Sequence, residues 1–212
     1  MNIIIHRGTH QIGGSAIEIS TASTRIILDF GNELSLDEKY TPINLDIDGV
    51  TKGLPDCDGI VISHYHMDHL GQLTSALPEI PLYMGELSKE IALIGAEYQD
   101  RCLYLRLLGA NTFRGGDAFS IGDIRIRPLV IDHSAADSYM FVLEAEGKHV
   151  LYTGDFRMHG LRHHILDQLV NTYIGEVDVL ITEGTSLSRD ADKYISEAAV
   201  LDDISSYIQD GK

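Results

Sequence analysis

The chain has 212 residues, 44% of them hydrophobic and 23% charged, a composition typical of a globular domain that buries its own core. Its formal net charge of −16 repels nucleic acid at long range, and no Lys or Arg cluster resembles a track for phosphates. No apolar run is long enough to span a membrane, and the first residues lack the features of a secretory signal. We therefore expect a cytoplasmic protein that is not bound to a membrane.

Short apolar runs separated by glycine-rich turns predict the elements of the first half of the chain. A short helix ended by Pro78 and a longer helical pattern, expected to break at Gly95, follow the early strands. The expected strands are 2–6, 15–20, 24–30, 59–63 and 81–84, and the expected helices are 70–77 and 86–108.

The second half begins at a turn, Gly115-Gly116-Asp117, and has a hairpin at Glu146-Gly147-Lys148. Blocks of strands with helices between them predict an α/β sandwich, in which two packed sheets are covered by helices. The expected strands are 123–131, 138–144, 149–153 and 177–182, and the expected helices are 161–173 and the amphipathic segment 191–209.

A cluster of metal-ligand residues directly follows the strand at 59–63. His64, His66, Asp68 and His69 place four ligand-type side chains within six positions. Imidazole nitrogens and carboxylate oxygens are ligands that Zn²⁺ takes in proteins, and a catalytic site leaves one position for water. The cluster therefore predicts a divalent metal site rather than a histidine-rich polar loop.

Two later residues fit the same site. His133 and Asp155 each follow a predicted strand, and functional side chains gather at strand ends in layered α/β folds. Each would be an ordinary turn residue by itself, but together with the cluster both are interpreted as metal ligands.

These residues resemble the motifs of the metallo-β-lactamase superfamily, and among its members the RNase J-like and β-CASP nucleases. The resemblance spans nearly the whole chain and implies a four-layer αββα sandwich of the α/β (α+β) class. Its motifs are Leu28-Asp29-Phe30-Gly31, the 64–69 cluster, His133, and Asp155; the nuclease subgroup is indicated by the loop at 7–15, Gly154-Asp155-Phe156-Arg157 and Thr182-Glu183-Gly184-Thr185.

The resemblance also implies roles for the site residues. His64, His66 and His133 would hold one metal ion, and Asp68 and His69 would hold a second. Asp155 would bridge the two ions, and Asp68 and Asp155 are the expected catalytic residues. The cofactors would be two divalent ions, Zn²⁺ foremost and Mn²⁺ as the alternative. Two further acidic residues, Asp29 and Glu183, would orient ligand imidazoles through their other ring nitrogen.

One ligand of the family is not matched. The family has a further histidine for its second metal, downstream of the Asp155 motif, and its β-CASP members insert a whole domain. We therefore expect residues 1–212 to be the N-terminal part of a metallo-β-lactamase-like domain, with the β-CASP domain and the last ligand segment downstream. His159, His163 and His164 are interpreted as solvated helix residues rather than replacements for that ligand.

The resemblance implies a phosphodiesterase that cleaves RNA, or single-stranded DNA, with a water activated by two metal ions. With a ligand missing, the 212-residue chain itself should be weakly active or inactive. Two other functions stay open, because one fold hosts many chemistries: hydrolysis of a small molecule such as a thioester or lactone, and a non-catalytic metal-binding scaffold. The oligomeric state, including a homodimer, is left open.

Overall fold

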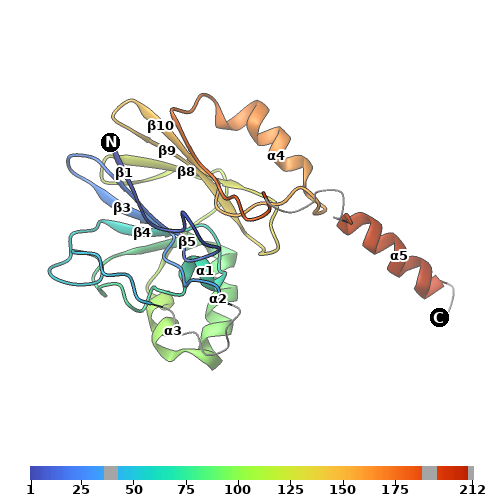
Figure 1. The fold of residues 1–212 in the computed structure, drawn as a ribbon, viewed down its shortest axis with the longest axis horizontal. Coiled ribbons are helices and arrows are strands. Elements are labelled where there is room, and N and C mark those ends of the chain that lie inside the picture. The colour runs from blue at the N-terminus through green and yellow to red at the C-terminus, as the bar shows by residue number, and fades with distance from the viewer. Residues whose placement is uncertain (36–42, 188–194, 210–212) are drawn as a thin grey trace.

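The computed structural model describes residues 1–35, 43–187 and 195–209 of the chain. Two β-sheets lie face to face, and helices cover the outer face of each (Figure 1). The first sheet has the strand order β1-β2-β3-β4-β5-β6. Its strands are β1 (Asn2–Arg7), β2 (Ala16–Ser20), β3 (Arg25–Leu28), β4 (Gly59–Ile62), β5 (Leu82–Gly85) and β6 (Asn111–Phe113).

The first sheet changes from antiparallel to parallel pairing at β3. The strands β1, β2 and β3 pair antiparallel, whereas β3, β4, β5 and β6 pair parallel. The carboxyl ends of β3 and β4 therefore lie at the same edge of the sheet. This edge carries Asp29 and the residues that follow β4.

The second sheet has the order β11-β10-β9-β8-β7. It is antiparallel from β7 to β10, and β11 pairs with β10 in parallel. Because β8 and β10 both pair antiparallel with β9, these two strands run in the same direction. Its strands are β7 (Phe119–Ile121), β8 (Ile124–Val130), β9 (Tyr139–Ala145), β10 (Lys148–Tyr152) and β11 (Val179–Ile181).

The helices form the two outer layers. On the first sheet lie α1, α2 and α3, and on the second lie α4 and the π-helix η1 that continues it (Figure 1). Their bounds are α1 (Met67–Leu70), α2 (Glu86–Gln99), α3 (Arg101–Leu108), α4 (His164–Leu169) and η1 (Val170–Ile174).

Three separate apolar clusters fill the interfaces between these four layers. One lies between α1, α2, α3 and the first sheet, one lies between the two sheets, and one lies between the second sheet and α4. The alternation of a strand assigns each residue to a face: in β9, Phe141 and Leu143 face the other sheet, whereas Met140 and Val142 face α4. The four-layer αββα sandwich expected from the sequence is confirmed.

Several predicted boundaries are wrong. Helix α2 continues through Gly95, where nothing crowds the backbone, and the break comes at Asp100. Asp100 is extended (φ −146°), and its side chain accepts hydrogen bonds from the amides of Cys102 and Leu103, which begins α3. The helix expected over 70–77 begins and ends earlier, as α1, because the amide of Gln72 donates instead to the carbonyl of Phe30.

Two short strands, β6 and β7, are absent from the prediction because three residues carry too little periodicity. The hairpin between β9 and β10 is confirmed: Glu146 (φ 51°) and Gly147 (φ 68°) are both left-handed, as a type I′ turn requires. The last predicted helix is α5 (Glu197–Gln209), and residues 191–194 of that prediction lie outside the described residues.

Helix α5 lies away from the sandwich and buries no side chain (Figure 1). Its N-terminus is nevertheless attached to the loop after β10, because Glu197 pairs with Arg157 (2.7 Å) and accepts a hydrogen bond from the amide of Leu161 (3.1 Å). None of the helices in the described ranges combines the length and apolarity needed to span a membrane.

The core between the sheets should dominate the stability of the fold. Phe141 is fully buried there, so Phe141→Ala should lower the free energy of unfolding by about 3–5 kcal/mol, measured by urea denaturation. The control, Leu54→Ala, removes a side chain that is 87% exposed and should change stability by less than about 0.5 kcal/mol. Equal effects of the two substitutions would contradict this packing.

Candidate metal centre

The predicted ligands follow the carboxyl ends of three strands, and Asp29, predicted to orient a ligand, follows a fourth. Asp29 follows β3, and the cluster begins at His64 after β4, both in the first sheet. His133 follows β8 and Asp155 follows β10, both in the second sheet. Since these loops come from facing sheets, the packing of one sheet on the other brings their side chains together.

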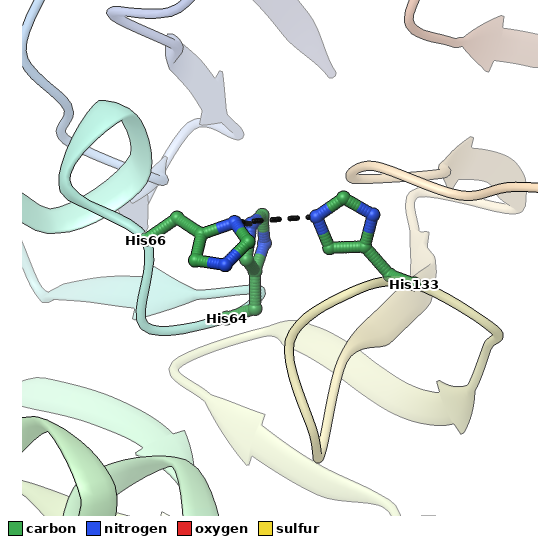
Figure 2. A group of neighbouring side chains, drawn as sticks. All are labelled: His64, His66 and His133. Atoms are coloured by element: carbon green, nitrogen blue, oxygen red, sulfur yellow. Dashed lines mark hydrogen bonds between the residues drawn. The ribbon is translucent and has the colours of Figure 1, made fainter. Parts of the chain in front are cut away.

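His64, His66 and His133 form the first candidate ligand group. His64 and His66 come from one loop and His133 from the opposite sheet, with ring nitrogens facing one another (Figure 2). The distance from His64 Nε2 to His66 Nδ1 is 3.1 Å, and that from His133 Nε2 to His66 Nδ1 is 3.3 Å. A tetrahedral ion with Zn–N bonds of about 2.0–2.1 Å needs nitrogens about 3.3 Å apart, so this donor set fits a divalent ion.

The second candidate group consists of His64, His69 and Asp155. His69 Nε2 lies 3.3 Å from Asp155 Oδ1 and 3.7 Å from Asp68 Oδ2. The other oxygen of Asp155, Oδ2, lies 3.9 Å from His133 Nε2. Each carboxylate oxygen of Asp155 therefore faces a different group, which is the arrangement a bridging ligand requires.

The Asp29 carboxylate lies beneath both groups. It is fully buried and has a left-handed backbone (φ 55°), a conformation that Asp adopts more readily than most residues other than glycine. Its oxygens lie within hydrogen-bond distance of His69 Nδ1 (2.7 Å), the Ser63 amide (2.7 Å), the Ser63 hydroxyl (2.8 Å) and the Tyr152 hydroxyl (2.5 Å). Asp29 thus contacts an imidazole, as the sequence predicts, and two further residues that the sequence did not indicate.

Ser63 lies in the segment that the sequence predicts as the metal site, but no individual role is predicted for Ser63 or Tyr152, because each lies at the end of an apolar run and resembles a packing residue. A signal was available, since both directly precede segments with predicted ligands. Ser63 lies next to His64, and Tyr152 lies three residues before Asp155.

The other predicted acidic residue, Glu183, follows β11 and contacts a loop instead of an imidazole. Its Oε1 accepts a hydrogen bond from the amide of Phe156 (2.8 Å), the residue after Asp155. Burial raises the pKa of Glu183, against that hydrogen bond. Glu183 thereby holds the Asp155 loop against the end of β11.

The loop that carries His133 is attached to the first sheet at two points. The Ala136 amide donates to the Tyr65 hydroxyl (3.2 Å), and the Ser88 amide, at the start of α2, donates to Asp137 Oδ2 (2.9 Å). Asp137 is itself left-handed (φ 61°). Tyr65, which lies between His64 and His66 in the sequence, therefore positions the His133 loop.

The histidines after Asp155 belong to neither ligand group in the described part of the chain. His163 Nδ1 lies 2.9 Å from the carbonyl oxygen of Gly160, and His164 begins α4. Cys57 and Cys102 are free thiols.

The charge environment differs between the two groups. Burial lowers the pKa of His64 far below its ordinary value, lowers that of His133 to about 4, and lowers that of His66 as well. Burial also disfavours a charged His69, but the charge of Asp29 and hydrogen bonds to Asp155 and Asp29 raise its pKa well above the ordinary value. Burial thus favours neutral imidazoles at His64, His66 and His133, whereas the neighbouring carboxylates stabilise the charged form of His69.

A groove of about 760 Å³ opens beside the second group. Asp68, His69 and Asp155 form part of its wall, and the loop at 8–13 and the segment at 181–185 line it as well. The candidate metal centre is therefore accessible to a sizeable ligand.

Comparison with known proteins agrees with this fold. A family model described as "Beta-lactamase superfamily domain" matches residues 24–201, so the chain belongs to that family. The metallo-β-lactamase resemblance noted in the sequence is confirmed, and the relatives include RNase J-like proteins.

The curated relatives are ribonucleases of low identity. Ribonuclease J of Helicobacter pylori is 26% identical and aligns with 71% of this chain and 22% of its own length. An RNase J-like protein of Methanocaldococcus jannaschii is 27% identical over 97% of this chain and 48% of its own. Endoribonuclease YSH1 of Gibberella zeae is 24% identical over 96% of this chain and 26% of its own length. The chain thus spans about half or less of the length of these proteins.

Solved structures support the fold alone. A protein of unknown function from Enterococcus faecalis V583 superposes with a TM-score of 0.80 at 21% identity, covering 98% of this chain and 57% of that one. The metallo-beta-lactamase fold protein YhfI from Bacillus subtilis gives a TM-score of 0.52 at 15% identity, covering 84% of this chain and 69% of that one.

The close approach of Gly31 to the ligand loop can be tested by adding one methyl group. A Cβ at Gly31 would lie 1.6 Å from the Asp68 carbonyl oxygen, so Gly31→Ala must displace the segment with Asp68 and His69. We expect metal affinity, measured by calorimetric titration, to fall roughly 10–100-fold, as for lost support of a ligand. Gly95→Ala, where nothing lies within 4 Å, is the control and should bind metal normally. Unchanged affinity in Gly31→Ala would contradict this packing.

The metal-free chain should lose stability as the pH falls from about 6.5 to 4. His133 stays neutral in the fold down to about pH 4 but takes up a proton near pH 6.5 once unfolded, so acid favours the unfolded chain. The difference between the folded and unfolded pKa of His133 corresponds to about 3 kcal/mol in the free energy of unfolding. Urea denaturation after chelation, compared between wild type and His133→Gln, measures it, and the variant should lose less stability over this range. Parallel pH profiles of the two would contradict the assignment.

Proposed function

We propose that this chain is the metal-binding part of a metal-dependent hydrolase, a ribonuclease of the RNase J-like β-CASP type with a dinuclear centre. The observation that carries the proposal is the placement of Asp155, whose Oδ1 faces His69 (3.3 Å) and whose Oδ2 faces His133 (3.9 Å). A carboxylate between two ligand groups suits two cations better than one. The ribonuclease relatives support the choice of RNA as the substrate, and single-stranded DNA is the second polymer to test.

The donor set indicates which residues would hold the ions. His64, His66 and His133 would hold the first, and His69 and Asp68 the second, with one oxygen of Asp155 directed to each. Nitrogen-rich ligands favour Zn²⁺, and the carboxylates also admit Mn²⁺. Bound there, such cations would supply an activated water and neutralise the negative charge of a phosphodiester.

The protein's own residues would then orient the ligand rings and position the loops that carry the ligands. Asp29 fixes the ring of His69, Glu183 holds the Asp155 loop through the Phe156 amide, and Tyr65 holds the loop of His133. The groove beside Asp68 and Asp155 gives a phosphodiester chain room to approach. With a net charge of −16, the chain would attract an anionic substrate mainly at the cations themselves.

Two other functions remain candidates on the same site. A small-molecule hydrolase would use the same ligands on a thioester or lactone, since this fold does not define the substrate. A scaffold would bind metal without turnover. Substrate comparison separates all three.

The test is a hydrolysis assay with labelled RNA, single-stranded DNA, a thioester and a lactone, in Zn²⁺ or Mn²⁺ and after chelation. We expect slow, metal-dependent cleavage of RNA that is lost in Asp155→Ala, because the family's further histidine is not matched in this chain. Gly95→Ala, remote from the site on α2, is the control and should cleave like wild type.

Each contrary result points to a different conclusion. Turnover of the thioester or lactone with RNA intact would contradict the nuclease proposal. Two bound ions with no hydrolysis of any substrate would favour a scaffold. Fast RNA cleavage abolished by Asp155→Ala would show that the second site is complete without a further histidine.

A further inference from the structure

The hydroxyl of Ser63 lies between the first ligand group and the Asp29 carboxylate. Ser63 is buried, with Oγ 2.8 Å from Asp29 Oδ2 and 3.0 Å from His64 Nδ1. The same Asp29 oxygen lies 2.7 Å from His69 Nδ1 and 2.5 Å from the Tyr152 hydroxyl. One carboxylate is therefore in direct contact with a ligand of the second group and one hydroxyl away from a ligand of the first.

The proton positions in this network follow from what each atom can do. Asp29 has donors around it: two hydroxyls, one backbone amide and the His69 ring, so its carboxylate oxygens accept from all of them. The single hydroxyl proton of Ser63 then points to Asp29. The lone pairs of Ser63 Oγ are left to accept from His64, which places the ring proton of His64 on Nδ1.

This tautomer is the one that metal binding needs. His64 Nε2 faces His66 Nδ1 at 3.1 Å and must be free of a proton to bind an ion. At His69, the contact with Asp29 keeps a proton on Nδ1 and leaves Nε2, which faces Asp155, as the nitrogen that would exchange its proton for an ion. The opposite direction of the hydroxyl, from Ser63 to His64, would put the ring proton on Nε2, inside the ligand group. The direction of one hydroxyl thus decides whether His64 can be a ligand.

We propose that Ser63 is a positioning residue that links Asp29 to His64, so that one carboxylate sets the proton position on two ligand imidazoles, His69 directly and His64 through the Ser63 hydroxyl. Tyr152 restrains Asp29 by donating to Oδ2, the oxygen that also receives Ser63 and His69. The relay rests on the metal-binding role proposed above for His64 and His69. It adds two residues, Ser63 and Tyr152, that touch no ion.

The first experiment observes the tautomer directly. Ring ¹⁵N NMR of the wild-type chain, with and without Zn²⁺, should show the His64 proton on Nδ1 in both states. A proton on Nε2 would overturn the relay, whatever the variants do. If the wild-type chain bound no ion, the proposed function would fail, while the metal-free spectrum would still decide the relay.

The second experiment measures what the hydroxyl contributes. In calorimetric Zn²⁺ titration, Ser63→Ala should weaken binding roughly 10–100-fold, whereas Ser63→Thr, which keeps the hydroxyl, should stay within about threefold of wild type. Ser120→Ala is the control, since Ser120 is an exposed serine on β7, at the edge of the second sheet. Equal loss in Ser63→Ala and Ser63→Thr, or no loss in Ser63→Ala, would overturn the proposal.

Tyr152 is tested in the same titration. Tyr152→Phe removes only the hydroxyl on Asp29 and should weaken Zn²⁺ binding less than Ser63→Ala, by several-fold, because Ser63 and His69 still contact the carboxylate. Tyr83→Phe, at a ring stacked on Phe119, is its control and should bind like wild type. Wild-type affinity in Tyr152→Phe would remove Tyr152 from the network.

Discussion

The candidate centre depends on the packing of one β-sheet against the other. His64, His66 and His69 follow a strand of the first sheet, and His133 and Asp155 follow strands of the second. Neither sheet by itself therefore carries a complete ligand group. The apolar core between the sheets holds these loops at ligand distance. The bonds from Ala136 to Tyr65 and from Ser88 to Asp137 then fix the loop of His133 across the same interface. Apolar burial thus sets the position of the polar groups.

The sequence predicted much of this arrangement because its signals are local. The histidine cluster follows an apolar strand, the hairpin has residues that adopt left-handed conformations, and His133 and Asp155 each follow a strand. What escaped prediction depends on distant contacts. Ser63 and Tyr152 acquire their roles only when β10 places the Tyr152 hydroxyl beside Asp29, 123 positions earlier in the chain. The break at Asp100 and the early end of α1 similarly depend on particular hydrogen bonds, to the amides of α3 and to Phe30.

Several of the acidic residues of the chain lie at the candidate metal centre, where they stabilise positive charge. Asp29, Asp155 and Glu183 follow the ends of β3, β10 and β11, Asp68 lies in α1, and their environments differ. Asp29 is buried beneath donors, Asp155 is partly exposed between two ligand groups, and Glu183 is bound to a backbone amide. Carboxylates so arranged stabilise positive charge, which agrees with the raised pKa of His69.

Tyr152 belongs to two parts of the molecule at once. Its ring lies in the core between the sheets, stacked 6.4 Å from that of Phe141, while its hydroxyl contacts Asp29. A change of side-chain volume in that core would therefore move the ring of Tyr152. Through Asp29, it would also shift the ligand His69, although no ligand is substituted. The interior of this protein is consequently less free to vary than its apolar composition suggests, because the same ring that fills space also adjusts the chemistry.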